Sequence, residues 1–217
     1  FPQIMSHPNN KVSSSSVDNQ EIELIVGNSS ANFSGVTSTM LQVTSLQKHM
    51  INLRIMGKHF VPDPSMTITF WEVAKMCRRP LSNGKWRIFH ARRVDEMIQG
   101  VILKYVFRAK IKLVFSSAAQ RKRSASTVWL SNKMDAVIAM SNRSAKYLNK
   151  PPAKINLHGV QIDNYTPAEN KQEAWQALGY GGKYGIGILG RVREQKGVHL
   201  FVDACIKVLP KYPDVNA

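Results

Sequence analysis

Short apolar runs alternate with segments of helical periodicity along most of the chain. The strand-type runs lie at 22–27, 51–57, 86–90, 110–117, 135–141 and 154–160, and the helical segments lie at 36–49, 93–107, 118–133 and 142–148. The segment 66–79 fits either type. Because such alternation is typical of doubly wound sheets, we predict an α/β fold with mostly parallel strands and helices on both faces.

The alternation pauses at 163–167 and then begins again. A helical segment at 170–180 leads through a glycine-rich turn to a strand-type run at 184–190 and a long helical segment at 196–212. We therefore expect a Rossmann-like domain at 21–167, and a linker helix with the start of a second domain at 168–217. The segment 1–20 is rich in Ser and Asn and is expected to be a disordered leader. Since the chain begins with Phe and closes on the turn-like sequence PDVNA, we expect a fragment of a longer protein.

The net charge is the unusual feature of the composition. There are 30 Lys and Arg against 14 Asp and Glu, which gives a formal charge of +16 at pH 7. This excess favours an anionic partner such as a phosphorylated substrate or an anionic membrane surface. No zinc-finger spacing, RNA-binding signature or recognition-helix pattern accompanies the charge, so we expect no nucleic acid. A basic nucleic-acid-binding module and a merely solvated basic surface stay open as alternatives.

The sequence also bears on the compartment. No apolar run reaches the ~18 residues that a membrane-spanning helix needs, and the first residues lack the pattern of a signal peptide. Cys77 and Cys205 lie far apart and indicate neither a disulfide framework nor a metal site. We expect a monomeric cytoplasmic protein without a metal ion or other cofactor.

In open parallel sheets, ligands bind beyond the carboxyl ends of the strands. The first candidate site there is the segment FSGVTST, after the first strand-type run and at the start of a helix. Gly35 would let the backbone approach a ligand closely, and the hydroxyl of Thr37 lies beside the free N–H groups of the helix start. Simple capping of the helix by Ser and Thr is the alternative.

His90, Arg92 and Arg93 form the second candidate site, directly after the run WRIF. A histidine at the exit of a central strand can hydrogen-bond into the cleft, and two arginines can hold anionic groups. The alternative is a satisfied structural histidine beside two surface arginines.

The third candidate site lies at the end of the chain. Gly190 closes a strand-type run, Gly197 stands near a helix start, and Arg191 and Lys196 lie between them. Two cations beside a helix N-terminus can hold a diphosphate, although solvated loop cations are the alternative. The sequence GIGILG at 185–190 matches GxGxxG but is itself the strand, so it does not indicate a dinucleotide site.

Five segments occur in an order found in a known family: SGVTST, WRIFHARRVDEM, the stretch from LVFSSAAQRKR to AVIAMS, INLHGVQIDNYTP and GRVREQKGVHLFVDA. The chain resembles retaining glycosyltransferases of family 4, most closely the lipopolysaccharide core biosynthesis mannosyltransferases of Gram-negative bacteria. The resemblance covers roughly residues 22–215. His158 and Gln161 depart from the pattern, because they stand where the family has Asn and Asp.

The resemblance implies the GT-B architecture, in which two Rossmann-like domains face each other across a cleft. It implies that His90 is the catalytic-site histidine that contacts the transferred sugar. It also implies that Gly35, Gly190, Arg191 and Lys196 bind the donor. We place the acceptor near Thr37, Arg92 and Arg93.

The implied reaction is transfer of a hexose, mannose in the relatives, from a nucleotide sugar such as GDP-mannose with retention and without a bound metal. The acceptor would be a phosphorylated lipopolysaccharide core at the anionic surface of the inner membrane, where the protein would be peripheral. The family's paired glutamates would lie beyond Ala217, so we expect the chain to be C-terminally truncated and inactive alone. A non-catalytic binding module is the remaining alternative.

Overall fold

The computed structural model describes residues 21–159, 162, 165–190 and 192–217. The chain forms two compact units, with the boundary between Val160 and Gln161. The leader predicted at 1–20 lies outside the described residues. We describe each unit by itself.

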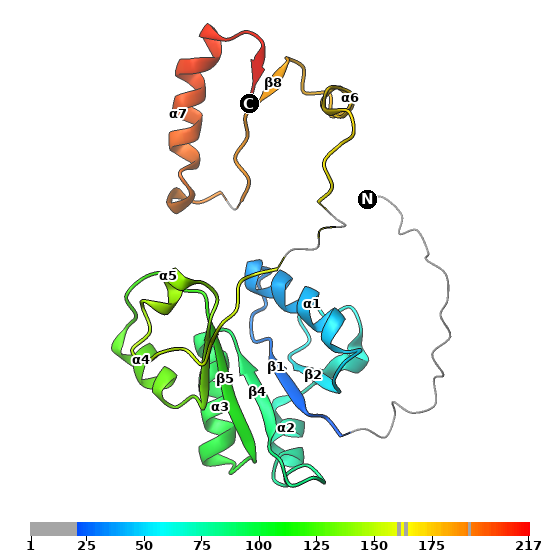
Figure 1. Ribbon diagram of the computed structural model, residues 1–217, viewed down its shortest axis with the longest axis vertical. Helices are drawn as coiled ribbons and strands as arrows, with labels where there is room; N and C mark the ends of the chain where they lie inside the picture. Colours follow the sequence, from blue (N-terminus) through cyan, green and yellow to red (C-terminus); the bar gives the residue numbers. More distant parts are fainter. Residues whose placement is uncertain (1–20, 160–161, 163–164, 191) are drawn as a thin grey trace, which may run out of the picture. The chain divides into compact units, whose positions relative to one another are not determined.

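The first unit is built on a seven-stranded sheet of order β3-β2-β1-β4-β5-β6-β7 (Figure 1). Every strand pair in this sheet is parallel. The strands are β1 Leu24–Gly27, β2 Leu53–Met56, β3 Thr67–Ile68, β4 Arg87–Ala91, β5 Ile111–Ser117, β6 Ala136–Ala139 and β7 Lys154–Ile155. The predicted α/β fold with a Rossmann-like parallel sheet is therefore confirmed.

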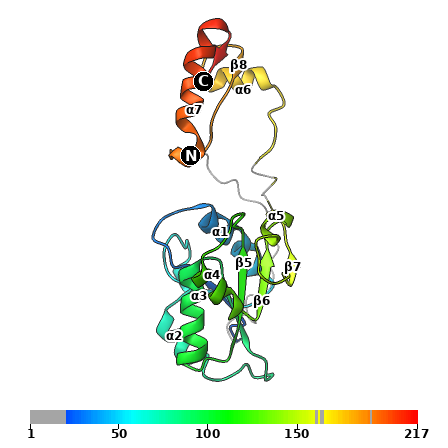
Figure 2. The same cartoon turned by 90° about the vertical axis from the view of Figure 1, so that its left-hand side faces the viewer.

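Helices cover the two faces of this sheet (Figures 1 and 2). They are α1 Gly35–Gln47, α2 Phe70–Met76, α3 Val94–Val101 with a π-helical turn at Ile102–Val106, α4 Ala125–Asn132 and α5 Asn142–Ala145, with a 3-10 turn at Pro64–Met66 before β3. Successive side chains of β1 point to opposite faces. Leu24 and Val26 accordingly belong to one core cluster with Met40 of α1, whereas Ile25 belongs to the cluster on the other face that includes residues of α2, α3 and α4.

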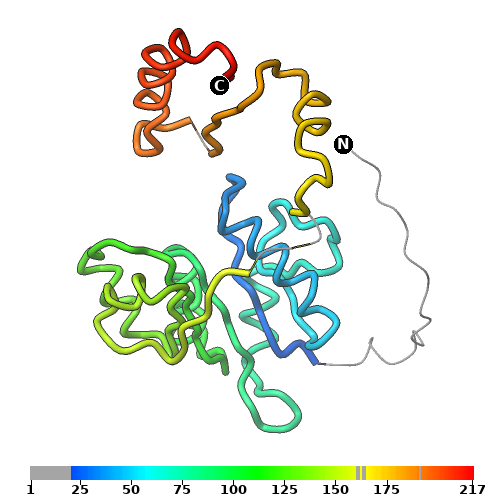
Figure 3. The backbone as a smooth tube through the Cα atoms, turned by 45° about the horizontal axis from the view of Figure 1, so that its top comes forward, coloured from blue at the N-terminus to red at the C-terminus, as the bar shows by residue number. Residues whose placement is uncertain are grey.

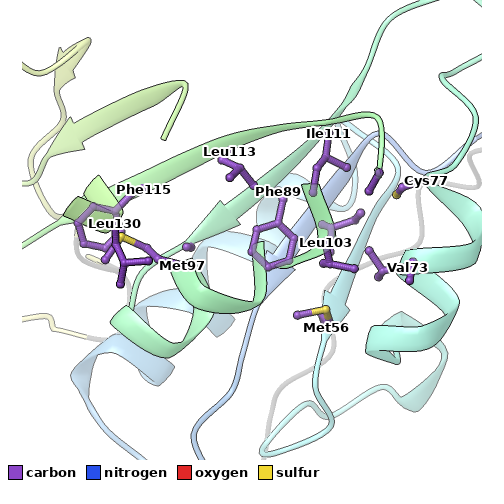
Figure 4. Packing of buried hydrophobic residues seen from close by; sticks show 14 residues of the cluster. Met56, Val73, Cys77, Phe89, Met97, Leu103, Ile111, Leu113, Phe115 and Leu130 are labelled. Carbon is purple, nitrogen blue, oxygen red and sulfur yellow. The ribbon is translucent and has the colours of Figure 1, made fainter. Parts of the chain in front are cut away.

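The larger core lies between the sheet and helices α2, α3 and α4. Figure 4 shows Phe89 of β4 among Leu103, Ile111 and Leu113 in this core. Gly100 lets α3 approach closely, because a Cβ atom there would lie 2.9 Å from the Phe89 ring. This close packing fixes the carboxyl ends of β4 and β5, which carry the candidate site.

The basic helix predicted from 118 to about 133 is shorter than expected. Helix α4 begins only at Ala125, where the Ser124 side chain accepts a hydrogen bond from the backbone N–H of Thr127. The residues before it carry no apolar side chain larger than Ala, so a helix there would have nothing to bury against the sheet. Residues 118–124 form a loop instead.

The second unit contains α6 Lys171–Ala177, β8 Tyr184–Gly185, α7 Val198–Val208 and β9 Val215–Asn216, with 3-10 turns at Glu194–Lys196 and Leu209–Lys211. In Figure 3 the helices α6 and α7 are the yellow and the orange-red coils of the tube. The strand expected at 184–190 is only two residues long. It pairs in parallel with β9, which lies in the final stretch that we expected to be a turn. The partner strand β9 is only two residues long, so it can accept and donate hydrogen bonds along only a short stretch of the backbone of β8. This accounts for the reduced length of β8. The assignment of this unit to a second domain stays a prediction.

Candidate functional site

The candidate site lies where the connections of the sheet diverge. The chain leaves β1 for β2 on one side, whereas β4 and β5 continue on the other side, so adjacent β1 and β4 are a switch point. Two hollows open at the carboxyl ends of the strands nearby. The Gly35 hollow, about 440 Å³, is lined by Ser34, Gly35, Val36, Thr39, Arg92, Ser116, Ala118, Met140 and His158. The Arg123 hollow, about 520 Å³, is lined by Val36, Arg92, Arg93, Val94, Phe115, Ser116, Ala118, Ala119, Arg121, Lys122, Arg123, Ser124 and Thr127.

Gly35 is the first residue of α1 and lines the hollow that we name after it. A Cβ atom at this position would meet no other atom within 4 Å, so the space beside its Cα is open. The chain itself does not require a glycine there, and a ligand that approaches the backbone is an independent reason for one. The predicted close approach at Gly35 is compatible with this geometry and stays a prediction.

Thr37 lies in the first turn of α1 but faces the protein interior. Its side chain is fully buried, and its Oγ1 accepts a hydrogen bond from Nη2 of Arg93 at 2.9 Å. The backbone N–H of Thr37 donates to Ser34, which caps the helix. The structure thus gives Thr37 a role in positioning the start of α1. Its contact with an acceptor stays a prediction.

His90 lies on β4 between Val26 of β1 and Val114 of β5. Its Nε2 is 2.8 Å from Oγ of Ser116, which lines both hollows. Burial of the ring, reinforced by the positive charge of Arg92, lowers the pKa of His90 to about 4. At neutral pH this imidazole is uncharged. His90 is not itself among the residues that line either hollow and borders the site through Ser116, so its predicted contact with the transferred sugar stays a prediction.

Arg93 is engaged inside the protein, whereas Arg92 is not. Nη1 of Arg93 donates to Glu96 at 3.1 Å, and its Nη2 donates to Ser34 as well as to Thr37. Arg92 lines both hollows, and burial lowers its pKa to about 10. Its buried Nη1 has no hydrogen-bond partner among the described residues. Arg92 is therefore the arginine of this pair that is available to a ligand.

Glu96 joins the elements that surround the site. This fully buried carboxylate accepts hydrogen bonds from the backbone N–H groups of Arg92 and Arg93 and from Oγ of Ser29. Gly27 leaves room for it, because a Cβ atom there would lie 3.0 Å from the Glu96 side chain. We call Glu96 and Arg93 with their partners Ser29, Ser34 and Thr37 the Glu96 link. It ties together the ends of β1 and β4 and the starts of α1 and α3.

The predicted phosphate cradle belongs to the second unit. Gly197 adopts a left-handed conformation with φ of 70° and precedes α7, and Lys196 ends the short 3-10 turn before it. Gly190 has φ of 147°, which also favours glycine. Arg191 lies outside the described residues. The donor-binding role of this segment stays a prediction.

Three residues that contribute to the site were not predicted from the sequence. Ser116 ends an apolar strand as part of a Ser pair, which is the signal that could have found it. Arg123 was assigned to a helix, and Glu96 was overlooked within the amphipathic pattern of α3. In the part of the chain that the structure describes, no three His, Cys, Asp or Glu residues gather as metal ligands, and no helix is long and apolar enough to cross a membrane.

Two curated proteins are similar to nearly the whole chain. The lipopolysaccharide core biosynthesis mannosyltransferase LpcC of Rhizobium leguminosarum bv. viciae is 38% identical over 202 residues, which are 92% of this chain and 56% of LpcC. The corresponding enzyme LpsB of Rhizobium meliloti (strain 1021) is 38% identical over 203 residues, which are 93% of this chain and 57% of LpsB. The chain is a relative of these mannosyltransferases. The resemblance to lipopolysaccharide core biosynthesis mannosyltransferases that was inferred from its motifs is confirmed.

This relative of the mannosyltransferases spans a little more than half of their length. No protein-family model matches the chain. Among solved structures, Anabaena HepE in complex with UDP-glucose has a TM-score of 0.61 at 17% identity, over 90% of this chain and 59% of HepE. HepE in complex with UDP and glucose has a TM-score of 0.60 over the same shares of the two chains. At this identity, the likeness to HepE shows a common fold.

Proposed function

We propose that the chain is the acceptor-side part of a retaining GT-B glycosyltransferase of family 4. It would act in transfer of mannose from a nucleotide sugar, GDP-mannose, to a lipopolysaccharide core acceptor. The observation that carries this proposal is the 38% identity to LpcC and LpsB, which extends over more than nine tenths of the chain. The Gly35 hollow, near the switch point of the sheet, would hold the sugar, and its position at the carboxyl ends of the strands supports this.

The residues of the site would share the work as follows. The uncharged His90 and its partner Ser116 would hydrogen-bond the sugar that is transferred. Charge that develops on the departing diphosphate is best stabilised by fixed cations and helix N-termini. Arg191 and Lys196 would supply that charge, and Gly35 and Gly190 would admit the phosphates. The acceptor would approach along Arg92.

Donor transfer can be tested in a chimera, because the chain spans only part of its curated relatives. We would replace the matching segment of LpcC with this chain and measure transfer of radiolabelled mannose from GDP-mannose to deacylated lipopolysaccharide core. We expect transfer by the chimera and a strong loss of turnover in its His90→Ala variant. If the chimera is folded but transfers no mannose under conditions in which LpcC is active, the proposal is wrong.

The isolated chain is expected to bind donor weakly. Arg191 and Lys196 alone offer solvated ion pairs worth at most ~1 kcal/mol each. We therefore expect no measurable turnover and dissociation constants in the millimolar range or weaker for GDP-mannose and UDP-glucose. Isothermal titration of both donors checks this expectation, and micromolar binding would contradict it.

We also propose that the protein works in the cytoplasm, peripherally on the anionic inner membrane. An aromatic face with one exposed lysine on the first unit supports this, and it is formed by Trp71, Phe107, Tyr105, Trp129 and Lys133. Trp71 and Trp129 are 69% and 56% exposed, and Lys133 lies over the rings of Tyr105 and Trp129. Exposed Trp and Tyr beside lysines are suited to the lipid–water interface.

Sedimentation with vesicles tests the membrane proposal. We expect binding to phosphatidylglycerol vesicles, little binding to phosphatidylcholine vesicles, and a loss of binding in the Trp71→Ala, Trp129→Ala double variant. A filter-binding assay with DNA tests the nucleic-acid alternative, which predicts affinity that falls steeply with salt. Tight DNA binding together with indifference to both vesicle types would favour that alternative.

A further inference from the structure

The loop 118–124 brings a run of cations to the Arg123 hollow. Arg121, Lys122 and Arg123 line this hollow together with Arg92 and Arg93. No Asp or Glu is among its lining residues. The nearby carboxylate of Glu96 is occupied by Arg93 and by two backbone N–H groups. The hollow therefore has a positive charge that the described residues do not neutralise.

Arg123 is held in place but is not satisfied. Its guanidinium lies 5.3 Å from the centre of the Phe115 ring, and its Nη2 donates to Oγ of Ser117. Its Nε and Nη1 are buried and have no hydrogen-bond partner among the described residues, and burial lowers its pKa. Nη1 of Arg92, which lines the same hollow, is likewise buried without a hydrogen-bond partner among the described residues. Buried hydrogen-bond donors without acceptors destabilise a fold. Several such donors around one hollow therefore indicate a ligand that supplies the acceptor atoms.

The start of α4 adds to the same site. Ser124 caps this eight-residue helix, and Ser124 and Thr127 both line the Arg123 hollow. The positive end of the helix dipole thus lies beside the unpaired guanidinium groups. Planar guanidinium groups match the oxygen atoms of a phosphate better than any other side chain does.

We propose that the Arg123 hollow binds a phosphate monoester carried by the sugar acceptor, with Arg123 and Arg92 as its principal ligands. The two hollows share Val36, Arg92, Ser116 and Ala118. An acceptor that approaches along Arg92, beside the sugar in the Gly35 hollow, can therefore place a phosphate substituent in the Arg123 hollow. The identification of the phosphate as the acceptor's rests on the proposed function. The phosphates of the donor are the other source of the same chemistry, and the experiment separates the two.

The binding experiment uses the 217-residue chain and isothermal titration with N-acetylglucosamine 1-phosphate, N-acetylglucosamine and GDP. We expect the phosphorylated sugar to bind more tightly than the free sugar. In the Arg123→Met variant its affinity should fall about tenfold, since a charge-assisted contact is lost, while GDP binding stays unchanged. Lys85→Met, which removes an exposed cation from the same unit outside both hollows, is the matched control and should bind like the parent chain.

Thermal unfolding separates binding from a structural role. Methionine keeps the packing on Phe115, and removal of the unsatisfied donors offsets the lost hydrogen bond to Ser117, so Arg123→Met should be about as stable as the parent chain. A lower unfolding temperature together with unchanged phosphate binding would show that Arg123 is structural and would overturn the inference. An equal loss of GDP and sugar phosphate binding would overturn it too, because the hollow would then belong to the donor.

The LpcC chimera separates this inference from the proposed function. Arg123→Met should raise the KM for a phosphorylated core acceptor and leave the KM for GDP-mannose unchanged. The same acceptor treated with phosphatase should be insensitive to the substitution. An active chimera without this acceptor effect would overturn only the inference. An inactive chimera whose sugar phosphate binding still depends on Arg123 would support the phosphate site and overturn only the transferase proposal.

Discussion

At the scale of single residues, His90 and Gly35 offer the sharpest tests of the site. The buried ring of His90 resists protonation, and no described atom of the chain lies within 4 Å of where a Cβ atom of residue 35 would be. The first property affects stability as a function of pH. The second distinguishes a glycine kept for the fold from one kept for a ligand.

The depressed pKa of His90 predicts a loss of stability in mild acid. The unfolded chain takes up a proton at His90 near pH 6.5, whereas the folded protein resists protonation down to about pH 4. The free energy of unfolding should therefore fall by up to about 3 kcal/mol as the pH drops through that window. Urea unfolding of the parent chain and of His90→Gln measures it, and the variant should show a flatter profile.

The control for this experiment is His49→Gln, which changes an exposed histidine outside the site. It should keep the profile of the parent chain. If His90→Gln has the same pH dependence as the parent chain between pH 6.5 and 4, then His90 is not held uncharged by its surroundings.

Gly35→Ala should leave the fold intact and impair transfer. An added Cβ meets no atom of the chain, and alanine favours the helix start, so stability should stay the same or rise by up to about 1 kcal/mol. In the LpcC chimera we expect turnover to fall at least tenfold, because small displacements of a substrate are costly. Full activity with unchanged stability would show that no ligand approaches Gly35.

At the scale of secondary-structure elements, the Glu96 link connects parts of the first unit that are distant in sequence. Glu96 and Arg93 reach Ser29, Ser34 and Thr37. The link sets the mutual position of α1, β4 and α3 without contacting solvent at Glu96. Both hollows depend on those elements.

Glu96→Gln should destabilise the protein strongly. The substitution removes the charge that Arg93 pairs with and turns one acceptor toward backbone N–H groups into a donor. Breaking a buried ion pair of this kind costs on the order of 3 kcal/mol. Denaturant unfolding measures the loss. Asp95→Asn, in the same helical turn but exposed, should change stability by less than about 0.5 kcal/mol. Equal effects of the two substitutions would contradict this prediction.

The elements of the sheet could be predicted from sequence because their apolar pattern is local. The strands β4 and β5 are short apolar runs in the sequence. The helical segments between such runs predict that neighbouring strands are parallel. The loop 118–124 could not be predicted, because its Ala, Gln, Arg and Lys residues favour a helix. The lack of an apolar face to pack against the sheet decides otherwise.

The site was predictable in part for the same reason. His90, Arg92 and Gly35 follow directly from the ends of strands and the start of a helix. Glu96 could not be recognised, because its importance depends on Ser29, which is 67 positions away. The burial of Thr37 likewise depends on Arg93, 56 positions away.

At the scale of the whole molecule, the two units differ in how much they bury. In the first unit β4 and β5 are each paired on both sides and covered by helices. Among the described residues of the second unit, only Cys205 is buried, while Leu200 and Ile206 of α7 are largely exposed. Apolar burial is the main source of stability, so the second unit should open more easily.

Hydrogen exchange measures this difference. We expect the amides of α7 to exchange much faster than those of β4 and β5 in the same sample, since exchange follows the free energy of local opening. Peptides from α1, a covered helix of the first unit, provide the comparison for helical structure. Protection of α7 equal to that of α1 would contradict the prediction.

The Glu96 link also bears on the order of events in folding. Its bonds join residues 56, 59 and 67 positions apart, so chain loops of that length must close before any of them can form. Such bonds are absent from an early nucleus made of local contacts. Weakening them should leave the rate of folding nearly unchanged and speed up unfolding. The bonds of Glu96 therefore form after the folding transition state, and they prolong the lifetime of the folded site by slowing its unfolding.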